Sequence, residues 1–572
     1  MIPILAVGFI TVATLALGTA GLRYARTTSN FFVASRAVHP VWNAFAVCGE
    51  AMSAASYLGV PALVLVFGVD ILWTIVGWTI GFLLLSLFIA APVRRFGSYT
   101  IPEFAEGRLD APRLRPLVAV MVIVSSWFFL LAQLKGAGVV TRSLIGTPYW
   151  VGVVVVGVLV AANLSAGGMR GITFVQGFQF FFIFLGILVP FTVISALWLG
   201  DDDRPSITGA EAPAFVEEVE AVYPRAVELI VPEDTEVIID GGEPVVLEAG
   251  VASIEAGTTI VWPAGAPAPH AEGIPRLSGE QWATPLGDKP VGGGHPVYFA
   301  YAIVLANMFG IISLPHIVVR FYTNPTGHEA RRTSLWVLAM IVPYYAMLPL
   351  IAAAGRVVAP DLLGTGTTDA VTVVAPERFV DGLSSELLTA VVSAGATAAF
   401  LSTSSGLLIA MAGALSHDII SAGIPQFRRS VWLGAAVSIA AALYVETIDI
   451  NVLIGWSTAI AASSIGPVLV LGIWWTRFTR RGAFATVAVG GTSATAAVLV
   501  SWSGVAGDGW PGAIVATPAA WSVPLAFCVG VVVSLRDDRV VPDVGYKMAL
   551  MHLPERSSPS PSSPSSPTVE GR

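Results

Sequence analysis

The chain has 572 residues, of which 55% are hydrophobic and only 12% are charged. Soluble domains carry about 25% charged residues, so this composition excludes an ordinary soluble protein and predicts an integral membrane protein. The formal net charge of −8 is unevenly spread, and the two cysteines, Cys48 and Cys528, both lie in apolar stretches, which excludes a disulfide framework.

Thirteen apolar segments are long enough to be membrane spans. The first segment begins with MIPILAV and has no basic residue before it. A cleaved signal peptide would have a basic leader, so this start favours a retained span whose amino terminus lies outside. The predicted spans are 2–21, 41–67, 71–93, 116–141, 148–166, 172–199, 297–319, 333–357, 385–414, 430–447, 451–475, 482–503 and 514–535.

The basic residues predict the orientation. With the amino terminus outside, 22 of the 30 basic residues fall in cytoplasmic segments, among them Arg23, Arg26, Arg170 and Arg320. The opposite orientation would violate the positive-inside rule. We therefore expect a multi-pass protein of the plasma membrane, with the amino terminus outside and the carboxyl terminus in the cytoplasm.

Residues 200–296 form a long insertion on the outer side in this topology. They carry 18 acidic residues, beginning with Asp201–Asp203, against four basic ones. Alternating apolar and polar residues between Gly and Pro predict a few short strands, although a solvated acidic loop fits about as well. The tail, 541–572, ends in a Ser/Pro-rich stretch that predicts disorder in the cytoplasm.

The insertion divides the chain into two halves of five spans, 41–199 and 297–475. Each half opens with an expected helix break, at Gly49–Ser53 and at Asn307–Gly310. Matching breaks predict inverted repeats with a binding site at the membrane midplane. The remaining expected units are an extra first span with a cytoplasmic loop, two additional spans and the tail, which are 1–40, 476–540 and 541–572.

Adjacent hydroxyls interrupt the apolar run Leu387–Ala414. Ser402 and Thr403, followed by Ser404 and Ser405, suit a cavity that strips water from a small hard cation. The alternative is that these hydroxyls only bond the i−4 carbonyls of their own helix. A glycine beside a carboxylate at Gly49-Glu50 could offer unwound carbonyls to the same cation, which suggests an ion-coupled transporter.

Several separated motifs occur in one order along residues 30–500. They are FFVASRAVHPVWNAFAVCGEAMSAASYLGVPALVLVFGVD, RRFGSYTIPEFAEGRL, GGMRGITFVQGFQ, MFGIISLPHIVVRFYTNPTGHEARRT, AFLSTSSGLLIAMAGALSHDI and STAIAASSIGPVLVLGIWWTRFTRRGA. This pattern resembles the sodium:solute symporter family, and most closely its acetate and short-chain monocarboxylate permease branch. The resemblance implies an all-α, leucine-transporter-type core of ten helices in inverted five-helix repeats, with one span before it and two after.

The resemblance also implies a sodium site. Its ligands would be backbone carbonyls of Gly49, Met52 and Ala399 and the hydroxyls of Ser402 and Thr403. Sodium would be the coupling ion, and we expect no other metal or cofactor.

Two residues depart from the family pattern. Glu50 stands where the branch usually has Asp, and we expect it to give electrostatic support rather than ligation. Gln176 replaces an Asp found in many members of the wider family, which removes a coupling role attached to that acid.

Three further polar or aromatic residues could line the substrate pocket: Ser56, Gln133 and Phe309. Each could equally serve helix packing. His316 lies one helical turn before Arg320, and this spacing suggests a pair at the membrane boundary.

The expected function is secondary active transport, not catalysis: sodium-coupled uptake of acetate, propionate or pyruvate by alternating access. A symporter of another small solute such as proline, or a transporter-like sensor, stays possible. The expected partners are the carboxylate, sodium and the lipid bilayer, with no nucleic acid; a small membrane partner is possible. The exact substrate, sodium versus proton coupling, the role of the insertion and the oligomeric state stay open.

Overall fold

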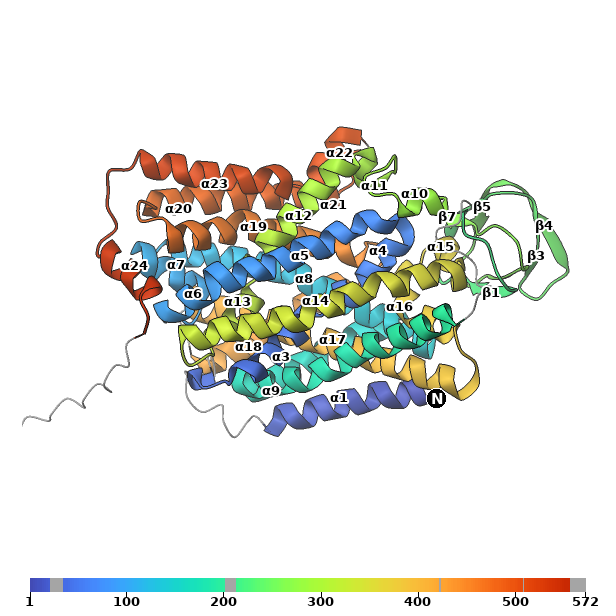
Figure 1. Cartoon of the computed structure of the whole chain (residues 1–572), viewed down its shortest axis with the longest axis horizontal. Coiled ribbons are helices and arrows are strands. Elements are labelled where there is room, and N and C mark those ends of the chain that lie inside the picture. Colours follow the sequence, from blue (N-terminus) through green and yellow to red (C-terminus); the bar gives the residue numbers. More distant parts are fainter. Residues whose placement is uncertain (21–33, 201–211, 421–422, 508, 556–572) are drawn as a thin grey trace, which may run out of the picture.

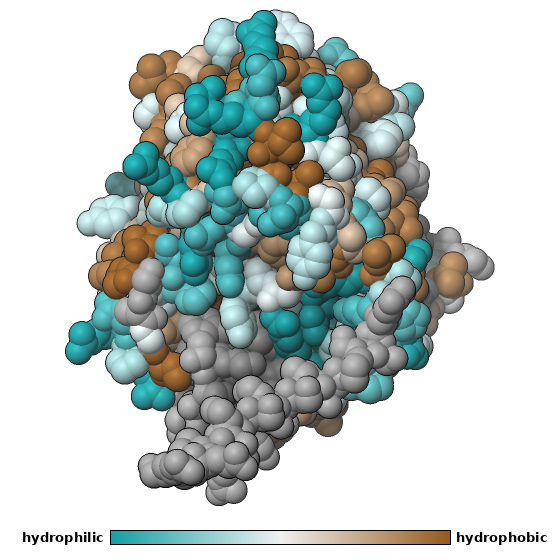
Figure 2. Space-filling model, turned by 90° about the vertical axis from the view of Figure 1, so that its left-hand side faces the viewer, coloured by the Kyte–Doolittle hydropathy of each residue, from teal (hydrophilic) through white to brown (hydrophobic). Residues whose placement is uncertain are grey.

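The computed structural model describes residues 1–20, 34–200, 212–420, 423–507 and 509–555. Arg23, Arg26, Asp201–Asp203 and the tail beyond 555 lie outside this part of the chain. Long helices run side by side along the longest axis, with β-strands at one end and the short helix α24 (Val544–His552) at the other (Figure 1). We call these ends the lid end and the tail end. Figure 2 looks onto the tail end and shows hydrophilic residues over the middle of that face, with hydrophobic residues towards its sides.

Every one of the thirteen predicted apolar segments is mainly helical. The helices of the first half are α1 (Ile2–Ala20), η2 (Ala34–Arg36), α3 (Pro40–Ala51), η3 (Ala55–Gly59), α4 (Val60–Phe67), η4 (Gly68–Ile71), α5 (Leu72–Leu84), η5 (Leu85–Ile89), α6 (Ala90–Phe96), α7 (Ile101–Leu109), α8 (Leu114–Ile145) and α9 (Tyr149–Leu199).

Eighteen more helical elements of the described chain, α24 among them, follow residue 278. The others are α10 (Gly279–Ala283), α11 (Val291–Gly294), α12 (Pro296–Ser313), α13 (Pro315–Phe321), α14 (Gly327–Val358), α15 (Asp361–Thr365), η6 (Thr368–Ala370), α16 (Val371–Glu377), α17 (Gly382–Gly413), η7 (Ala414–Ile419), α18 (Ile424–Ala442), α19 (Ile450–Trp474), α20 (Arg480–Thr486), η8 (Val487–Gly491), α21 (Thr492–Trp502), α22 (Gly509–Ala516) and α23 (Ala519–Leu535).

Within the described ranges, nine helices are long and apolar enough to cross a membrane, or ten if α22 and α23, bent by 58°, form one span. This count is below thirteen because several predicted spans are broken, short or joined. Helix α3 has 12 residues before its break, and the first limb of α9, Tyr149–Ser165, is a shorter apolar helix. A bend at Gly168, whose φ of 59° lies in the left-handed region, separates this limb from the second limb of α9.

The first helix break lies within the predicted segment. Helix α3 ends at Ala51, Met52 and Ser53 are not helical, and the chain resumes in η3 and α4. The second predicted break, Asn307–Gly310, is wrong: α12 continues through it to Ser313 and breaks at Leu314. Pro315 explains the true position, because proline lacks an N–H and disfavours helical geometry in the residue before it.

The insertion folds into a small β-domain, so the prediction of strands is confirmed and the alternative of a solvated loop is wrong. One sheet has the order β1-β6-β3-β4 and the other β5-β2-β7, with all pairs antiparallel. Phe215, Tyr223, Leu229 and Trp262 contribute to its own apolar core. The strands are β1 (Val219–Val222), β2 (Val227–Val231), β3 (Thr235–Ile239), β4 (Pro244–Leu247), β5 (Gly250–Ile254), β6 (Thr259–Trp262) and β7 (His270–Ala271).

The tail prediction is wrong for residues 544–552. They form α24, which packs against α6 and buries Met551. Arg95 donates to the carbonyls of Met551 and His552, and a ring nitrogen of His552 lies 2.8 Å from the carbonyl oxygen of Ile473. Arg95 and the carbonyl of Ile473 therefore give this segment fixed partners, which its composition did not show.

Candidate functional site

The first helix break faces the middle of α17. The hydroxyl of Thr403 donates to the carbonyl oxygen of Glu50 at 2.8 Å. The Ser402 hydroxyl is buried and has no partner among the described residues. A Cβ added to Gly49 would lie 3.2 Å from that hydroxyl and 2.8 Å from the Gln176 carbonyl oxygen, so only glycine permits this close approach. The fold thus brings the predicted ligands on α3 and α17 together.

The hydroxyls of α17 do not all behave alike. Ser405 and Thr397 donate to carbonyls four residues earlier in their own helix, at 2.7 and 2.8 Å, as hydroxyls in membrane helices often do. Thr403 instead bonds α3, and the hydroxyls of Ser402 and Ser404 have no partner within the described ranges. The alternative that these hydroxyls merely satisfy their own helix therefore holds for Ser405 and fails for Ser402 and Thr403. Met52, at this break, and Ala399 of α17 are fully buried.

Glu50 forms a buried ion pair with Arg320 of α13. Arg320 Nε donates to Glu50 Oε2 at 2.9 Å, its Nη2 contacts Glu50 Oε1, and neither side chain is exposed. Thr173 accepts a further bond from Arg320 at 3.0 Å. Because a buried carboxylate needs a partner, the pair explains how Glu50 is accommodated inside the protein. Arg320 is thus not a cytoplasmic loop charge.

Gln176 belongs to the same network. Its Nε2 donates to Glu50 Oε1 at 2.8 Å and to the carbonyl oxygen of Ser402 at 2.9 Å, and its Oε1 accepts from Arg320. Gln176 therefore links the ion pair to the hydroxyl-bearing turn of α17. The absence of a carboxylate at this position leaves one negative charge, that of Glu50, against one positive charge, that of Arg320.

The second break borders a small central cavity. Its volume is about 20 Å³ for the centres of water-sized spheres, and a single water needs about 10–15 Å³ by this measure. The lining comes from both breaks and from neighbouring helices: Ala51, Ser53, Trp78, Phe129, Ile311, Leu314, His316, Ile317, Tyr345, Ile454 and Thr458. No arginine or lysine is among these described lining residues.

His316 is the polar residue that this cavity leaves without a partner. Its side chain is fully buried, both ring nitrogens lack a hydrogen bond within the described chain, and the ring lies 5.2 Å from that of Phe129. The expected boundary pair of His316 and Arg320 is therefore wrong: Arg320 bonds Glu50, while His316 faces the cavity. The Leu-Pro pair before His316 was the sequence signal for this position.

The three residues suggested for the substrate pocket are absent from the lining of this cavity. Gln133 accepts a bond from the backbone N–H of Ala54 at 2.9 Å, and its own Nε2 is buried without a partner. Ser56 is bonded to the Ser53 carbonyl at 3.2 Å and lies 3.3 Å from the Tyr344 hydroxyl. Phe309 packs against Phe527 of α23, with ring centroids 5.2 Å apart.

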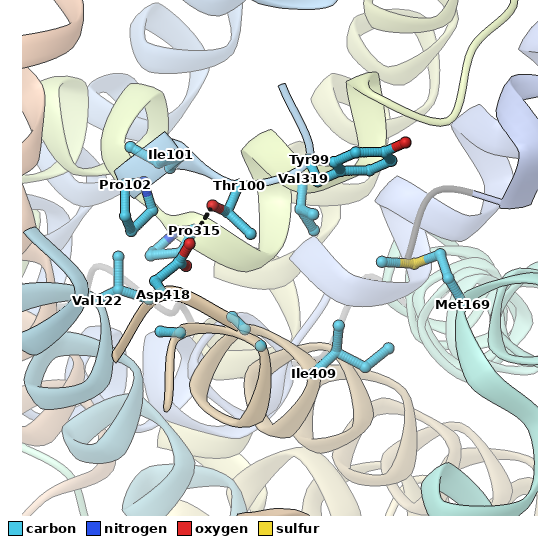
Figure 3. A pocket seen from close by; sticks show the side chains of 13 residues that line it. Tyr99, Thr100, Ile101, Pro102, Val122, Met169, Pro315, Val319, Ile409 and Asp418 are labelled. Carbon is cyan, nitrogen blue, oxygen red and sulfur yellow. Dashed lines mark hydrogen bonds between the residues drawn. The ribbon is translucent and has the colours of Figure 1, made fainter. Parts of the chain in front are cut away.

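Two larger openings lie along α12 and α13, one on each side of the central cavity. A lid-side cavity of about 440 Å³ is lined by α4, α12, α19 and the α22–α23 elbow, including Phe67, Ala306 and Asp449. At the tail side, a cleft of about 30 Å³ is lined by Pro315, Val319 and Ile409, and Thr100 donates to Asp418 across it at 2.9 Å (Figure 3). Along α12 and α13 the lining passes from the lid-side cavity, through the central cavity, to the tail-side cleft.

A buried polar centre at two helix breaks, with openings towards both ends, defines a membrane transporter of the broken-helix class. Comparisons with known proteins agree. The sequence profile of the sodium:solute symporter family matches residues 31–238 and 293–490, so the chain belongs to this family. It is a multi-pass membrane protein and a sodium-coupled symporter, not an enzyme.

Three relatives align over most of both chains. A monocarboxylic acid transporter of Corynebacterium glutamicum is 26% identical, over 92% of this chain and 90% of its own. Uncharacterized symporters of Cupriavidus necator and Bacillus subtilis are 28% and 26% identical, over 90% and 88% of this chain and 88% of each relative.

The fold is of the leucine-transporter type. A sodium-coupled sialic acid symporter in a substrate-bound, outward-open state superimposes with a TM-score of 0.61, at 13% identity, covering 94% of this chain and 98% of that one. Mhp1, a nucleobase-cation-symport-1 family transporter, gives a TM-score of 0.52 at 14% identity, covering 92% and 99%.

Proposed function

We propose that this protein takes up a small monocarboxylate, such as acetate, propionate or pyruvate, together with sodium. The lid end would face the cell exterior and the tail end the cytoplasm. The proposal assigns sodium to the carbonyls of Gly49, Met52 and Ala399 and the hydroxyls of Ser402 and Thr403. The carboxylate would occupy the central cavity beside His316.

The observation that carries the sodium assignment is the unpartnered, buried hydroxyl of Ser402. A buried hydroxyl without a hydrogen bond costs free energy, and an ion-coordinating role removes that cost. Na⁺ is a hard cation that prefers oxygen ligands, and this turn supplies hydroxyl and carbonyl oxygens at a place where α3 has stopped being helical. Glu50 would not be a ligand, because Arg320 and Gln176 already occupy its carboxylate.

The cargo assignment rests on the cavity lining, charge and kinship. The central cavity has room for about one water molecule in this conformation and must widen for a carboxylate, and the apolar side chains that border it fit a short alkyl group. His316 can donate a hydrogen bond to a carboxylate, and bound sodium would offset the negative charge. The monocarboxylic acid transporter among the relatives supports the same substrate class.

Uptake of labelled acetate into proteoliposomes, with and without an inward sodium gradient, tests the proposal. We expect saturable, sodium-dependent uptake that propionate and pyruvate compete with, whereas proline and glucose do not. A proton gradient at equal sodium on both sides should not replace the sodium gradient. Competition by proline but not by acetate would refute the cargo and leave the sodium coupling intact.

Cysteine labelling tests the orientation. Glu236→Cys on the β-domain and Tyr546→Cys on α24 both place a thiol at an exposed position. In intact cells, an impermeant thiol reagent should modify the first variant and spare the second until the cells are opened. The reverse pattern would invert every side assignment above.

A further inference from the structure

The β-domain is connected to α12 by a segment that crosses the lid end. We call residues 277–294 the strap; it contains α10 and α11 and runs directly into α12. The family profile leaves residues 239–292 unmatched. Most of the strap therefore lies outside the part of the chain that the family profile describes, so the profile assigns it no role.

Trp282 of the strap binds the lid-side end of the first broken helix. Its Nε1 donates to the carbonyl oxygens of Val64 and Leu65 in α4, at 2.8 and 3.2 Å. These carbonyls belong to the last turn of α4, where intrahelical partners become scarce; the Val64 carbonyl also accepts from the N–H of Gly68. The indole is almost fully buried, and the guanidinium of Arg356, from α14, lies 5.5 Å from its ring centroid. Trp282 thus joins α4 to α14.

A buried ion pair reinforces this contact. Lys289 Nζ lies 3.0 Å from Asp70 Oδ2, and each side chain is 1% exposed. The backbone N–H of Leu286 donates to the other carboxylate oxygen of Asp70 at 2.6 Å. At Gly68 the φ is +72°, and a Cβ there would lie 2.0 Å from the Trp282 carbonyl oxygen, so the turn after α4 is shaped to receive the strap.

The strap also forms part of the lid-side cavity. Val291, Gly292 and Gly293 line it together with Phe67 at the end of α4 and with residues of α12. The strap therefore connects the lid-side halves of both broken helices, α4 and α12, across the mouth of this cavity. In alternating access such half-helices move while the midplane site stays fixed.

We propose that Trp282, Lys289 and Asp70 are positioning residues of the lid-side gate, which fasten α4 to the strap so that α4 and α12 move as one unit. The strap thereby limits how readily the lid-side cavity opens towards the central cavity. This inference rests on sodium-coupled symport by this fold and is independent of the identity of the cargo and of the sodium ligands.

A plain packing role makes a different prediction. A buried ion pair is weak evidence for stability, because neutral residues of similar size often replace it without loss. If the pair only holds the β-domain in place, the double variant Asp70→Asn/Lys289→Met should behave like the parent protein. If the pair positions the gate, the double variant should fold normally and still open differently.

The test uses the full chain in membrane vesicles that expose the lid side, as checked with Glu236→Cys. Cys48 and Cys528 are replaced by alanine, and Ala306→Cys, on the wall of the lid-side cavity, reports opening through its rate of labelling by an impermeant thiol reagent. The strap variants are Trp282→Phe, which removes the indole N–H bonds and part of the ring, and Asp70→Asn/Lys289→Met. Glu236→Gln, on an exposed β-domain position, is the control.

We expect both strap variants to label about three- to tenfold faster, a factor of ten corresponding to ~1.4 kcal/mol. The maximal uptake rate should fall severalfold, while the substrate concentration for half-maximal uptake changes by less than about twofold, because the central cavity is untouched. Glu236→Gln should match the parent. Unchanged labelling in both strap variants overturns the proposal. If no carboxylate is transported at all, the labelling rates still decide the role of the strap.

Discussion

The two helix breaks differ in how their polar side chains are hydrogen-bonded. At the first, between α3 and η3, the charged group is fully bonded: the Glu50 carboxylate contacts Arg320 and Gln176. The Glu50 carbonyl accepts from Thr403, and the Ser402 hydroxyl stays without a partner among the described residues. At the second, at Leu314, His316 has two unpartnered nitrogens and faces a cavity lined mostly by apolar side chains. The dense network fits a site that fixes geometry for an ion, and the sparse one fits a site that leaves its bonding capacity to a cargo molecule.

The largest expected effect comes from breaking the ion pair at the first break. Arg320→Met leaves the Glu50 carboxylate buried without an opposite charge, with only the Gln176 amide still bonded to it among the described side chains. Breaking a buried ion pair in this way costs about 3–5 kcal/mol. We expect a loss of folded protein, or a fall of several degrees in the melting temperature measured in detergent.

The double variant Glu50→Gln/Arg320→Met should recover much of that stability, because no unpaired charge is left. Glu50→Asp should keep more transport than Glu50→Gln, since it keeps the charge opposite Arg320. If Arg320→Met is as stable as the parent protein, the network does not hold the first break together.

The next effect separates sodium affinity from cargo affinity. Ser402→Ala removes one oxygen from the proposed site and little packing. We expect the sodium concentration for half-maximal uptake to rise at least about tenfold, or ~1.4 kcal/mol. Thr403→Ala should act in the same direction.

Ser405→Ala is the matched control, because its hydroxyl is bonded within its own helix. If the sodium dependence of uptake is unchanged in both Ser402→Ala and Thr403→Ala, sodium does not bind at the first break.

At the second break, we expect a substitution to change the affinity for cargo and not the affinity for sodium. His316→Phe keeps a ring and removes the hydrogen-bond donor, and a bond to a charged group is worth about 1.5–3 kcal/mol. We expect the KM for acetate to rise about tenfold or more, with an unchanged sodium dependence at saturating acetate.

His316→Gln, which keeps a donor, should recover part of the affinity. A KM that does not respond to either substitution would place the cargo elsewhere.

The smallest effect is expected at Ser56. Its hydroxyl already bonds Ser53 and lies close to Tyr344, so it has no bond to give to a cargo molecule. Ser56→Ala should change KM by less than about twofold. A neutral hydrogen bond contributes about 1 kcal/mol net, and here the hydroxyl makes that bond to the protein and not to the substrate. A tenfold rise in KM would show that the cargo site extends from the second break to η3.

The first break was more predictable from sequence than the second. Hydroxyls and a Gly-Glu pair within apolar runs are conspicuous, and their chemistry is local, so Gly49, Glu50, Ser402 and Thr403 could be singled out. Arg320 could not, because an arginine at the end of an apolar run usually marks the membrane boundary, and its partner lies 270 residues away. His316 was misplaced for the same reason.

The parts of the fold outside the membrane were less predictable. Alternation indicated strands in the insertion, but the docking of Trp282 and Lys289 on α4 depends on contacts between distant segments. The α24 segment follows polar, charged residues and precedes a Ser/Pro-rich stretch, and only the tertiary contacts of Arg95 and Ile473 explain its order.

Gly406 shows what the length of one side chain demands of its neighbour. A methyl group at position 406 would lie 2.1 Å from Glu50 Oε1, so glutamate at position 50 requires glycine at position 406. Aspartate at position 50 would withdraw the carboxylate by one methylene and open room for alanine at 406. The two positions should therefore change together in evolution, and a double-mutant cycle on Glu50→Asp and Gly406→Ala should show strongly non-additive effects, with the pair better tolerated than Gly406→Ala alone.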